Sequence, residues 1–250
     1  MSGNHGFSDA WVVKLNSSGD IIWQKCFGGT NEDYAYSIQQ TSDSGFIVAG
    51  YTFSNDGDVS GYHGYFDYWV VKLNSSGDIE WQKCLGGTYY DYAYSIQQTS
   101  NGGFIVAGST NSNNGDVSGY HGYFDYWVVK LNSSGDIEWQ KCLGGTNNDY
   151  ANSIQQTSDG GFIVAGYTES NDGDVSGYHG GDYDAWVVKL NSSGDILWQK
   201  CLGGTIDDRA YSIQQTSDGG FIVAGFTVSN DGDVSGNHGA SDAWVVKLNK

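Results

Sequence analysis

The chain has 250 residues, of which 29 are acidic and 11 are basic, so its formal net charge is −18. This charge argues against binding to nucleic acid or to an anionic membrane through a basic surface. No run of about 18 apolar residues is present, which argues against a transmembrane helix. The chain has 38 glycines and no proline, so its turns must rely on Gly, Asn, Asp and Ser.

One ten-residue stretch recurs through the whole chain. It reads WVVKLNSSGD from Trp11, returns from Trp69, Trp127 and Trp186, and ends as WVVKLNK from Trp244. The spacings are 58, 58, 59 and 58 residues. Such a regular period indicates a repeat architecture. Because no unit stands apart from its neighbours, we expect one domain rather than two.

The second unit shows which strands to expect. In chain order they cover residues 92–99, 104–108, 126–131 and 137–143, with a glycine turn between the first two and a long polar loop over 111–124. Alternation in the last two strands is typical of β-structure, and it places Ile137 and Trp139 on the same face. Four antiparallel strands in each repeated unit predict an all-β fold, a β-propeller of four-stranded blades. Blades around an axis leave only short sheet edges exposed.

Features of one unit also resemble a known family. An Asp before the first strand, a strand that ends in Gly-x-Thr, an Asp-x-aromatic strand with Lys-Leu, and a Gly-Gly pair are similar to the short β-propeller repeats of bacterial and archaeal secreted or cell-surface proteins. These features fall on Asp149, Gly166, Thr168, Asp184, Trp186, Lys189, Leu190, Gly203 and Gly204. An aromatic residue in the outermost strand also resembles the kelch layout, at Trp23, Trp81, Trp139 and Trp198.

The resemblance implies an order of strands and a role. From the axis outward, the blade would run SIQQ, FIVAG, WVVKLN and IxWQKC. The family implies a surface or interaction role and a secreted or cell-surface parent protein, and it offers no catalytic residues to transfer. This chain departs from the family in having no Pro after Gly-x-Thr and in its longer loop.

The number of strands raises the question of how the ring closes. Units of about 34–86, 92–144 and 150–203 are complete, and 11–29 would complete the blade begun by 209–249. The fifth WVVKLN copy is then surplus. The alternative is a homo-oligomeric ring in which two chains supply eight blades. Residues 2–6 repeat residues 235–239 without a difference, so we interpret the chain as excised or engineered from a longer repetitive protein. No signal peptide is visible, which says little about the parent protein.

The long loop, SNDGDVSGYHG in its commonest form, contains an Asp-Gly-Asp sequence. Carboxylates around a sharp glycine turn are typical of calcium loops, whereas Asx-turns explain the same residues without a metal. The candidate metal ligands are Asp56, Asp58, Asp116, Asp172, Asp174, Asp231 and Asp233. No other cofactor is expected.

Aromatic residues concentrate in two loops that a propeller would place on one face. The candidate ligand-binding residues are Tyr62, Tyr65, Phe66, Tyr89 and Tyr90. They favour a protein or glycan ligand, although unconstrained drift also explains variable loop residues. We do not expect catalysis, because a catalytic site needs groups in unequal roles and near-identical units supply rings of the same residue. An enzyme such as a lyase or hydrolase is the last alternative.

The remaining repeated polar residues have structural interpretations. The cysteines in WQKC predict small buried side chains, and the single loop histidines predict hydrogen-bonded rings rather than metal ligands. Asn-Ser-Ser fits a glycosylation sequon or a turn between strands, of which we favour the turn. The Asp before each inner strand is expected to hold the turn that leads into it; these residues are Asp33, Asp91, Asp149 and Asp208.

Overall fold

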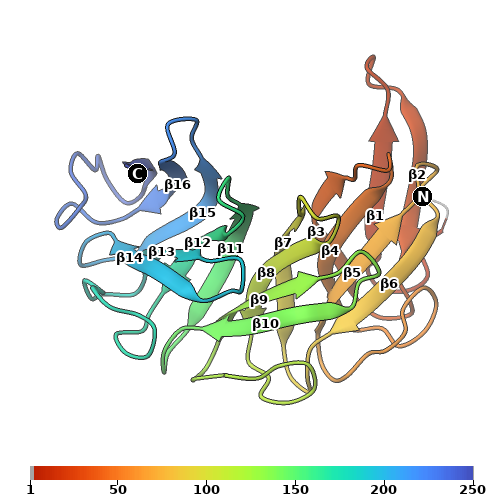
Figure 1. Ribbon diagram of the computed structural model, residues 1–250, viewed down its shortest axis with the longest axis horizontal. Helices are drawn as coiled ribbons and strands as arrows, with labels where there is room; N and C mark the ends of the chain where they lie inside the picture. The colour runs from red at the N-terminus through yellow and green to blue at the C-terminus, as the bar shows by residue number, and fades with distance from the viewer. Residues whose placement is uncertain (1–2, 250) are drawn as a thin grey trace.

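The computed structural model describes residues 3–249 as an open arc of β-sheets (Figure 1). The two ends of the chain lie at opposite ends of this arc. Within the described residues there are 17 strands in five antiparallel sheets. The strands are β1 (Ala10–Leu15), β2 (Ile21–Phe27), β3 (Asp33–Gln40), β4 (Phe46–Thr52), β5 (Asp67–Leu73), β6 (Ile79–Leu85), β7 (Asp91–Gln98), β8 (Phe104–Thr110), β9 (Asp125–Leu131), β10 (Ile137–Leu143), β11 (Asp149–Gln156), β12 (Phe162–Thr168), β13 (Asp184–Leu190), β14 (Ile196–Leu202), β15 (Asp208–Gln215), β16 (Phe221–Thr227) and β17 (Asp242–Leu248).

Three sheets are complete four-stranded blades in the predicted order. They are β3-β4-β5-β6, β7-β8-β9-β10 and β11-β12-β13-β14, and each strand pairs with the next one in the sequence. The predicted strands of the second unit agree with β7 to β10 within one or two residues at each end. The all-β class and the repeated four-stranded antiparallel blades are therefore confirmed. Within residues 3–249 the structure holds no helix long and apolar enough to span a membrane.

The two terminal sheets differ from the predicted closure of the ring. Strand β2 pairs with β1, β17 is the last strand of the sheet β15-β16-β17, and these two sheets remain separate. The blade begun by residues 209–249 is therefore not completed by residues 11–29 within this chain. The physical reason is that β1 and β2 pack against the first complete blade, at the opposite end of the arc from β17 (Figure 1).

The core lies between neighbouring blades, not within any one of them. Trp127 and Val129 of β9 face the preceding blade, where they join one apolar cluster. Tyr126 and Val128 face the following blade and join the next cluster. The third strand of a complete blade is therefore buried on both faces, which is why WVVKL carries large apolar side chains at alternate and adjacent positions.

Side chains of the inner strands connect each blade to the next. The Ser95 hydroxyl accepts a hydrogen bond from the Ile154 amide at 3.2 Å, and the Gln97 side-chain carbonyl accepts one from the Gln156 amide at 2.6 Å. The same two bonds recur at the other junctions between inner strands. This ladder explains why SIQQ is repeated without change.

Candidate functional site

A continuous row of aromatic side chains crosses four blades at one end of the inner strands. Each blade contributes up to three neighbouring positions: the second residue of its first strand, the facing residue near the end of its second strand, and the residue just before its third strand. In the second complete blade the first and third of these positions are Tyr92 and Phe124, whose ring centroids are 6.2 Å apart. We call this set the aromatic row.

Ring contacts link the aromatic row from blade to blade. Tyr51 meets Tyr92 with centroids 4.7 Å apart, and Phe124 meets Tyr150 at 5.1 Å. Tyr150 then meets Tyr167 at 5.2 Å. Contacts of this length are within the range in which aromatic pairs attract one another. The row is therefore a single surface, and its rings hold one another in place.

Three of the five predicted ligand-binding residues cluster in this surface. The rings of Tyr65 and Tyr90 stack with centroids 5.1 Å apart, and Phe66 lies 6.1 Å from Tyr90. Tyr62 stands beside them and donates its hydroxyl proton to the Tyr65 carbonyl at 2.6 Å. Tyr89 is half exposed, and no ring contact joins it to the row within residues 3–249.

The sequence reasoning missed the tyrosines on the inner strands. A β-bulge between Ala93 and Ser95 inserts Tyr94 as an unpaired residue. The bulge lets Ala93 and Ile96 both enter the core while Tyr92 and Tyr94 both reach the aromatic row. The sequence offered one signal for these tyrosines, which is the variable residue after FIVAG. In the first complete blade this residue is Tyr51, and it pairs across the sheet with the inner-strand residue Tyr34.

The only arginine of the chain lies in the last part of the aromatic row. The Arg209 guanidinium is 4.7 Å from the ring centroid of Tyr167 and 4.4 Å from that of Tyr183, at cation–π distance from both. Its Nε donates to Asp207 at 2.8 Å. This end of the row therefore carries a positive charge with a fixed acidic partner.

The predicted calcium ligands lie in the long loops, where they bind backbone amides. Asp56 accepts a hydrogen bond from the Thr30 amide at 2.8 Å, and Asp58 accepts one from the Gly28 amide at 3.3 Å. The corresponding residues of the other loops do the same: Asp116, Asp172, Asp174, Asp231 and Asp233. Within residues 3–249 no three acidic, His or Cys side chains converge as a metal site would require. Calcium binding at these carboxylates therefore stays a prediction.

The Asp before each inner strand holds the entry turn, as predicted. Asp91 accepts hydrogen bonds from the Gly87 amide at 2.8 Å and from the Ser112 hydroxyl at 2.9 Å, and a further bond from Thr110. Burial raises the pKa of Asp91 to about 6, although these hydrogen bonds lower it. Burial likewise raises the pKa of Asp149 to about 7.

The other repeated polar residues have the structural roles that were expected. His63 contacts the buried carboxylate of Asp67 through its ring nitrogen at 2.7 Å, and all five histidines make the equivalent contact. The Asn74 side chain accepts from the amides of Ser76 and Asp78, which makes Asn-Ser-Ser a turn. All four cysteines are free; three of them are buried, and the one near the N-terminus is half-buried.

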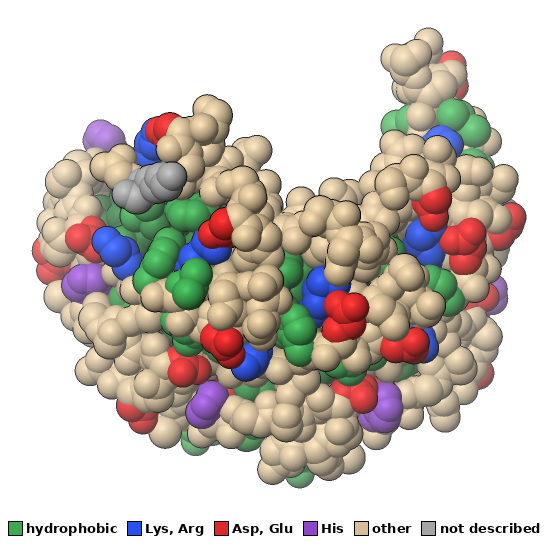
Figure 2. All heavy atoms as spheres, viewed as in Figure 1, with side chains coloured by type: hydrophobic (Ala, Val, Ile, Leu, Met, Phe, Trp, Pro, Cys, Tyr) green, Lys and Arg blue, Asp and Glu red, His purple; other side chains and the backbone are tan. Residues whose placement is uncertain are grey.

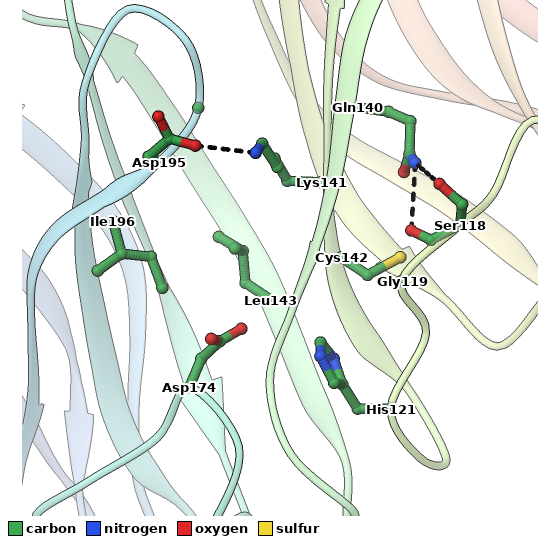
Figure 3. A pocket seen from close by; sticks show the side chains of 11 residues that line it. Ser118, Gly119, His121, Gln140, Lys141, Cys142, Leu143, Asp174, Asp195 and Ile196 are labelled. Atoms are coloured by element: carbon green, nitrogen blue, oxygen red, sulfur yellow. Dashed lines mark hydrogen bonds and ion pairs between the residues drawn. The ribbon is translucent and has the colours of Figure 1, made fainter.

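A cleft of about 510 Å³ opens between the second and third complete blades (Figure 3). His121, Cys142 and Asp174 line it, which are residue types that nucleophilic catalysis uses. The ring of His121, however, contacts Asp125, and within residues 3–249 no hydrogen bond joins it to the thiol. Burial raises the pKa of the Cys142 thiol far above its usual range, so the reactive thiolate is disfavoured. Figure 3 shows that the polar contacts here are Lys141 with Asp195 and Gln140 with Ser118.

Comparisons with known proteins assign no family to this chain. No family model matches this sequence. Regulatory protein FlaEY of Caulobacter vibrioides is 26% identical over 195 residues, which are 71% of this chain and 20% of that protein. Sqt1 from Chaetomium thermophilum has a TM-score of 0.39 and 12% identity, covering 76% of this chain and 40% of its own. A protein of unknown function from Dyadobacter fermentans has a TM-score of 0.48 and 12% identity, covering 85% and 62%. This chain thus spans about a fifth of the relative it matches in sequence, and its propeller-like fold is defined by its own repeated blades.

Proposed function

We propose that the chain is a non-catalytic β-propeller scaffold with a structural or protein-interaction role, and that the aromatic row is its binding face. The observation that carries the proposal is the continuity of the row: ring contacts run from Tyr51 to Tyr183 over three blades, and Arg209 extends the row to Phe226 in the fourth. Tyrosine and arginine are enriched among the residues that dominate binding energy at protein interfaces, and the rings of the row are half-buried, with part of their surface open to a partner. We further propose that the parent protein is secreted or displayed on the cell surface, as the resemblance of its repeats implies.

The absence of catalysis is part of this proposal. The acidic residues in the long loops accept hydrogen bonds from backbone amides, and those before the inner strands hold turns. The cleft between blades occurs twice with equivalent residues, at about 510 Å³ and about 500 Å³. Equivalent clefts suggest a repeated structural joint rather than one site with unequal catalytic groups.

A carbohydrate or peptide ligand is the second candidate. Sugar binding needs flat apolar rings together with hydrogen-bonding groups, and both occur in the middle of the row. The Asn148 amide donates to the Glu169 carboxylate at 2.8 Å, and the Tyr150 hydroxyl lies 3.3 Å from the Asn148 carbonyl. These polar groups border the rings and suit a ligand that carries hydroxyl groups.

Parallel glycan and peptide arrays test the proposal and separate its two forms. We expect Tyr65→Ala to lower binding of any ligand found, because Tyr65 stacks on Tyr90 and Phe53. Tyr123 is the matched control: it holds the same loop position one unit later and is 69% exposed, but within residues 3–249 no stacked ring accompanies it. Equal losses for both variants, or no binding on either array, would contradict the proposed binding face.

A further inference from the structure

The turn that follows each third strand fits against the preceding blade in the same way at three places. A Cβ atom placed on Gly135 would lie 2.8 Å from the Trp81 ring, and one placed on Gly194 would lie 2.8 Å from Trp139. Only glycine allows so close an approach at these positive φ angles. Gly77 lies against Trp23 in the same manner. Each junction is therefore a glycine turn that covers the outer-strand tryptophan of the preceding blade.

An ion pair accompanies each of these contacts. Lys83 donates to Asp136 at 2.8 Å, and Lys141 donates to Asp195 at 3.0 Å, in both cases across a junction. The aspartate is the last residue of the turn, directly after the glycine. A complete junction therefore needs a Gly-Asp turn from one side and a Trp-x-Lys strand from the other.

The C-terminal end of the arc has the Trp-x-Lys strand of such a junction but not the Gly-Asp turn. Trp198 and Lys200 line a cavity of about 650 Å³, together with Phe221 and Lys247. Among the described residues no glycine turn lies against Trp198, whereas Gly135 lies against Trp81 and Gly194 against Trp139. Figure 2 shows apolar and lysine side chains gathered at this end of the arc. On the adjoining face of β16, Ala224 is exposed, whereas its counterpart Ala165 is 0% exposed.

The N-terminal end of the arc has the Gly-Asp turn of such a junction. The β1–β2 hairpin carries a Gly19-Asp20 turn, and a Cβ atom on Gly19 would meet no atom within 4 Å. On the same hairpin Trp11 is 50% exposed, whereas its counterpart Trp127 is 0% exposed. A notch of about 170 Å³ lies between β1 and β3, beside the two-stranded sheet that β1 forms with β2.

The exposed side chain of Ile38 marks this notch. Ile38 is 53% exposed, whereas the equivalent Ile96 is 5% exposed because Ile47 and Ala49 of the preceding blade pack in the same cluster. The residues that correspond to Ile47 and Ala49 at the other end of the arc are Ile222 and Ala224 of β16. The C-terminal end therefore has the residues that would cover Ile38, and the N-terminal end has the Gly-Asp turn that would cover Trp198.

We propose that the cavity at Trp198 and Lys200 binds the β1–β2 hairpin of a second copy of this chain. The Gly19-Asp20 turn of that copy covers Trp198 and pairs with Lys200, and its β1 strand pairs with β16. The register is already set, because β1 pairs with β2 residue for residue as β13 pairs with β14. Two copies joined at both ends close a ring of eight blades. The hairpin comes from a second copy because the same chain's hairpin lies at the far end of the arc (Figure 1).

Strand β17 must leave when β1 of the partner arrives, because β17 occupies the edge of β16 that the proposal gives to β1, which has the same sequence AWVVKL. Trp244 is then released and Trp11 of the second copy takes its place. The hairpin enters as a unit because Ala10, Val12 and Phe27 already pack on the first complete blade. One surplus strand remains for each chain, which accounts for the fifth copy of the repeat.

Light scattering after size-exclusion chromatography tests the assembly over a concentration series. We expect a mass of twice 27.0 kDa for the full chain. A mass of 27.0 kDa at every concentration would overturn the proposal. Tyr123→Ser is the control: Tyr123 is 69% exposed in the loop before β9 of the second complete blade, away from both ends, so this variant must keep the doubled mass.

Complementation between two end variants separates loss of assembly from loss of folding. Ile38→Asp blocks the N-terminal notch and Ala224→Asp blocks the C-terminal face, so each alone should remain at the single-chain mass. An equimolar mixture still has one intact junction and should recover the doubled mass. Variants that dimerise alone, or a mixture that stays monomeric while both proteins keep their β-sheet circular dichroism, would refute the complementary ends.

A matched pair of substitutions tests which strand is displaced. Trp11→Ser should weaken dimerisation by at least about tenfold, as loss of a buried interface tryptophan does, whereas Trp244→Ser should leave it equal or stronger. The two tryptophans hold the same position in the repeat. The reverse result would show that β17 stays in its sheet, and it would overturn the proposed exchange.

Discussion

The buried aspartates before the inner strands should make this protein more stable in mild acid than in mild base. The pKa of Asp149 rises from 3.8 to about 7 and that of Asp91 to about 6, in both cases because burial disfavours the charged carboxylate. A group with a raised pKa in the folded state stabilises the fold when it is protonated. That stabilisation is complete below the unfolded pKa of 3.8 and is lost as the pH rises through 6 to 7.

The size of the effect follows from the two pKa values of each group. Between pH 5 and pH 8, linkage gives a loss of about 2.6 kcal/mol for Asp149 and about 1.4 kcal/mol for Asp91. We therefore expect urea unfolding to give a lower free energy of unfolding at pH 8 than at pH 5. Asp149→Asn removes one titrating group and should reduce the difference between the two pH values by about 2 to 3 kcal/mol.

The control is Asp195→Asn in an exposed turn. The pKa of Asp195 is lowered by the hydrogen bond from Lys141, so this group does not titrate between pH 5 and pH 8. This variant should keep the pH dependence of the parent protein. A free energy of unfolding that rises from pH 5 to pH 8, or an Asp149→Asn variant with an unchanged pH dependence, would show that these carboxylates are charged in the folded protein.

Three further predictions concern the junctions and the loops. Tyr68→Phe leaves the buried Trp127 carbonyl without its 2.9 Å hydrogen bond, and thermal unfolding should show a loss of about 1 to 3 kcal/mol. Gly135→Ala should destabilise more than Gly102→Ala, because both have φ of +82° but only Gly135 lies against a tryptophan ring; equal melting temperatures would contradict this contact. Because the loop carboxylates bind backbone amides, we expect the same melting temperature in EDTA and in calcium, and a higher one in calcium would restore the metal hypothesis.

The strands of each blade could be predicted from the sequence because local signals mark them. Glycine-rich turns separate β7 from β8, and apolar residues alternate along β9 and β10. The turn at Asn132 was also predictable, because Asn and Asp satisfy nearby backbone amides through their own side chains. These features depend on residues close in sequence, so periodicity and turn chemistry were sufficient.

Irregularities within strands could not be predicted in this way. Ile137 was expected on the face of Trp139, but a register shift between these two residues places Ile137 against the cluster that contains Cys142. The bulge at Tyr94 likewise brings Ala93 and Ile96 to the same core. A bulge adds one residue without any change in composition, so alternation alone gives the wrong face beyond it.

The sequence was also insufficient to predict which strands pair at the two ends of the arc. Five near-identical WVVKL strands have the same local signals, and nothing in β1 distinguishes it from β17 except its neighbours in space. Trp11 and Trp127 differ only in what packs on them, which leaves one half exposed and the other fully buried. Which copies pair is decided by the position of each blade along the arc, a property of the assembled chain.

The bulge on each inner strand affects which residues of the protein can be substituted without disturbing its core. Tyr94 has no partner in the sheet ladder, and its counterparts in the other units are Tyr36, Asn152 and Tyr211. The neighbouring core positions, in contrast, are always Ala and Ile. Asn152 donates a hydrogen bond to the Ala210 carbonyl of the next inner strand at 2.8 Å, so it belongs to the framework. Randomising the three tyrosines would alter the chemistry of the face while the Ala and Ile positions stay in the core. The fold therefore provides three library positions for selecting new ligands on an unchanged framework.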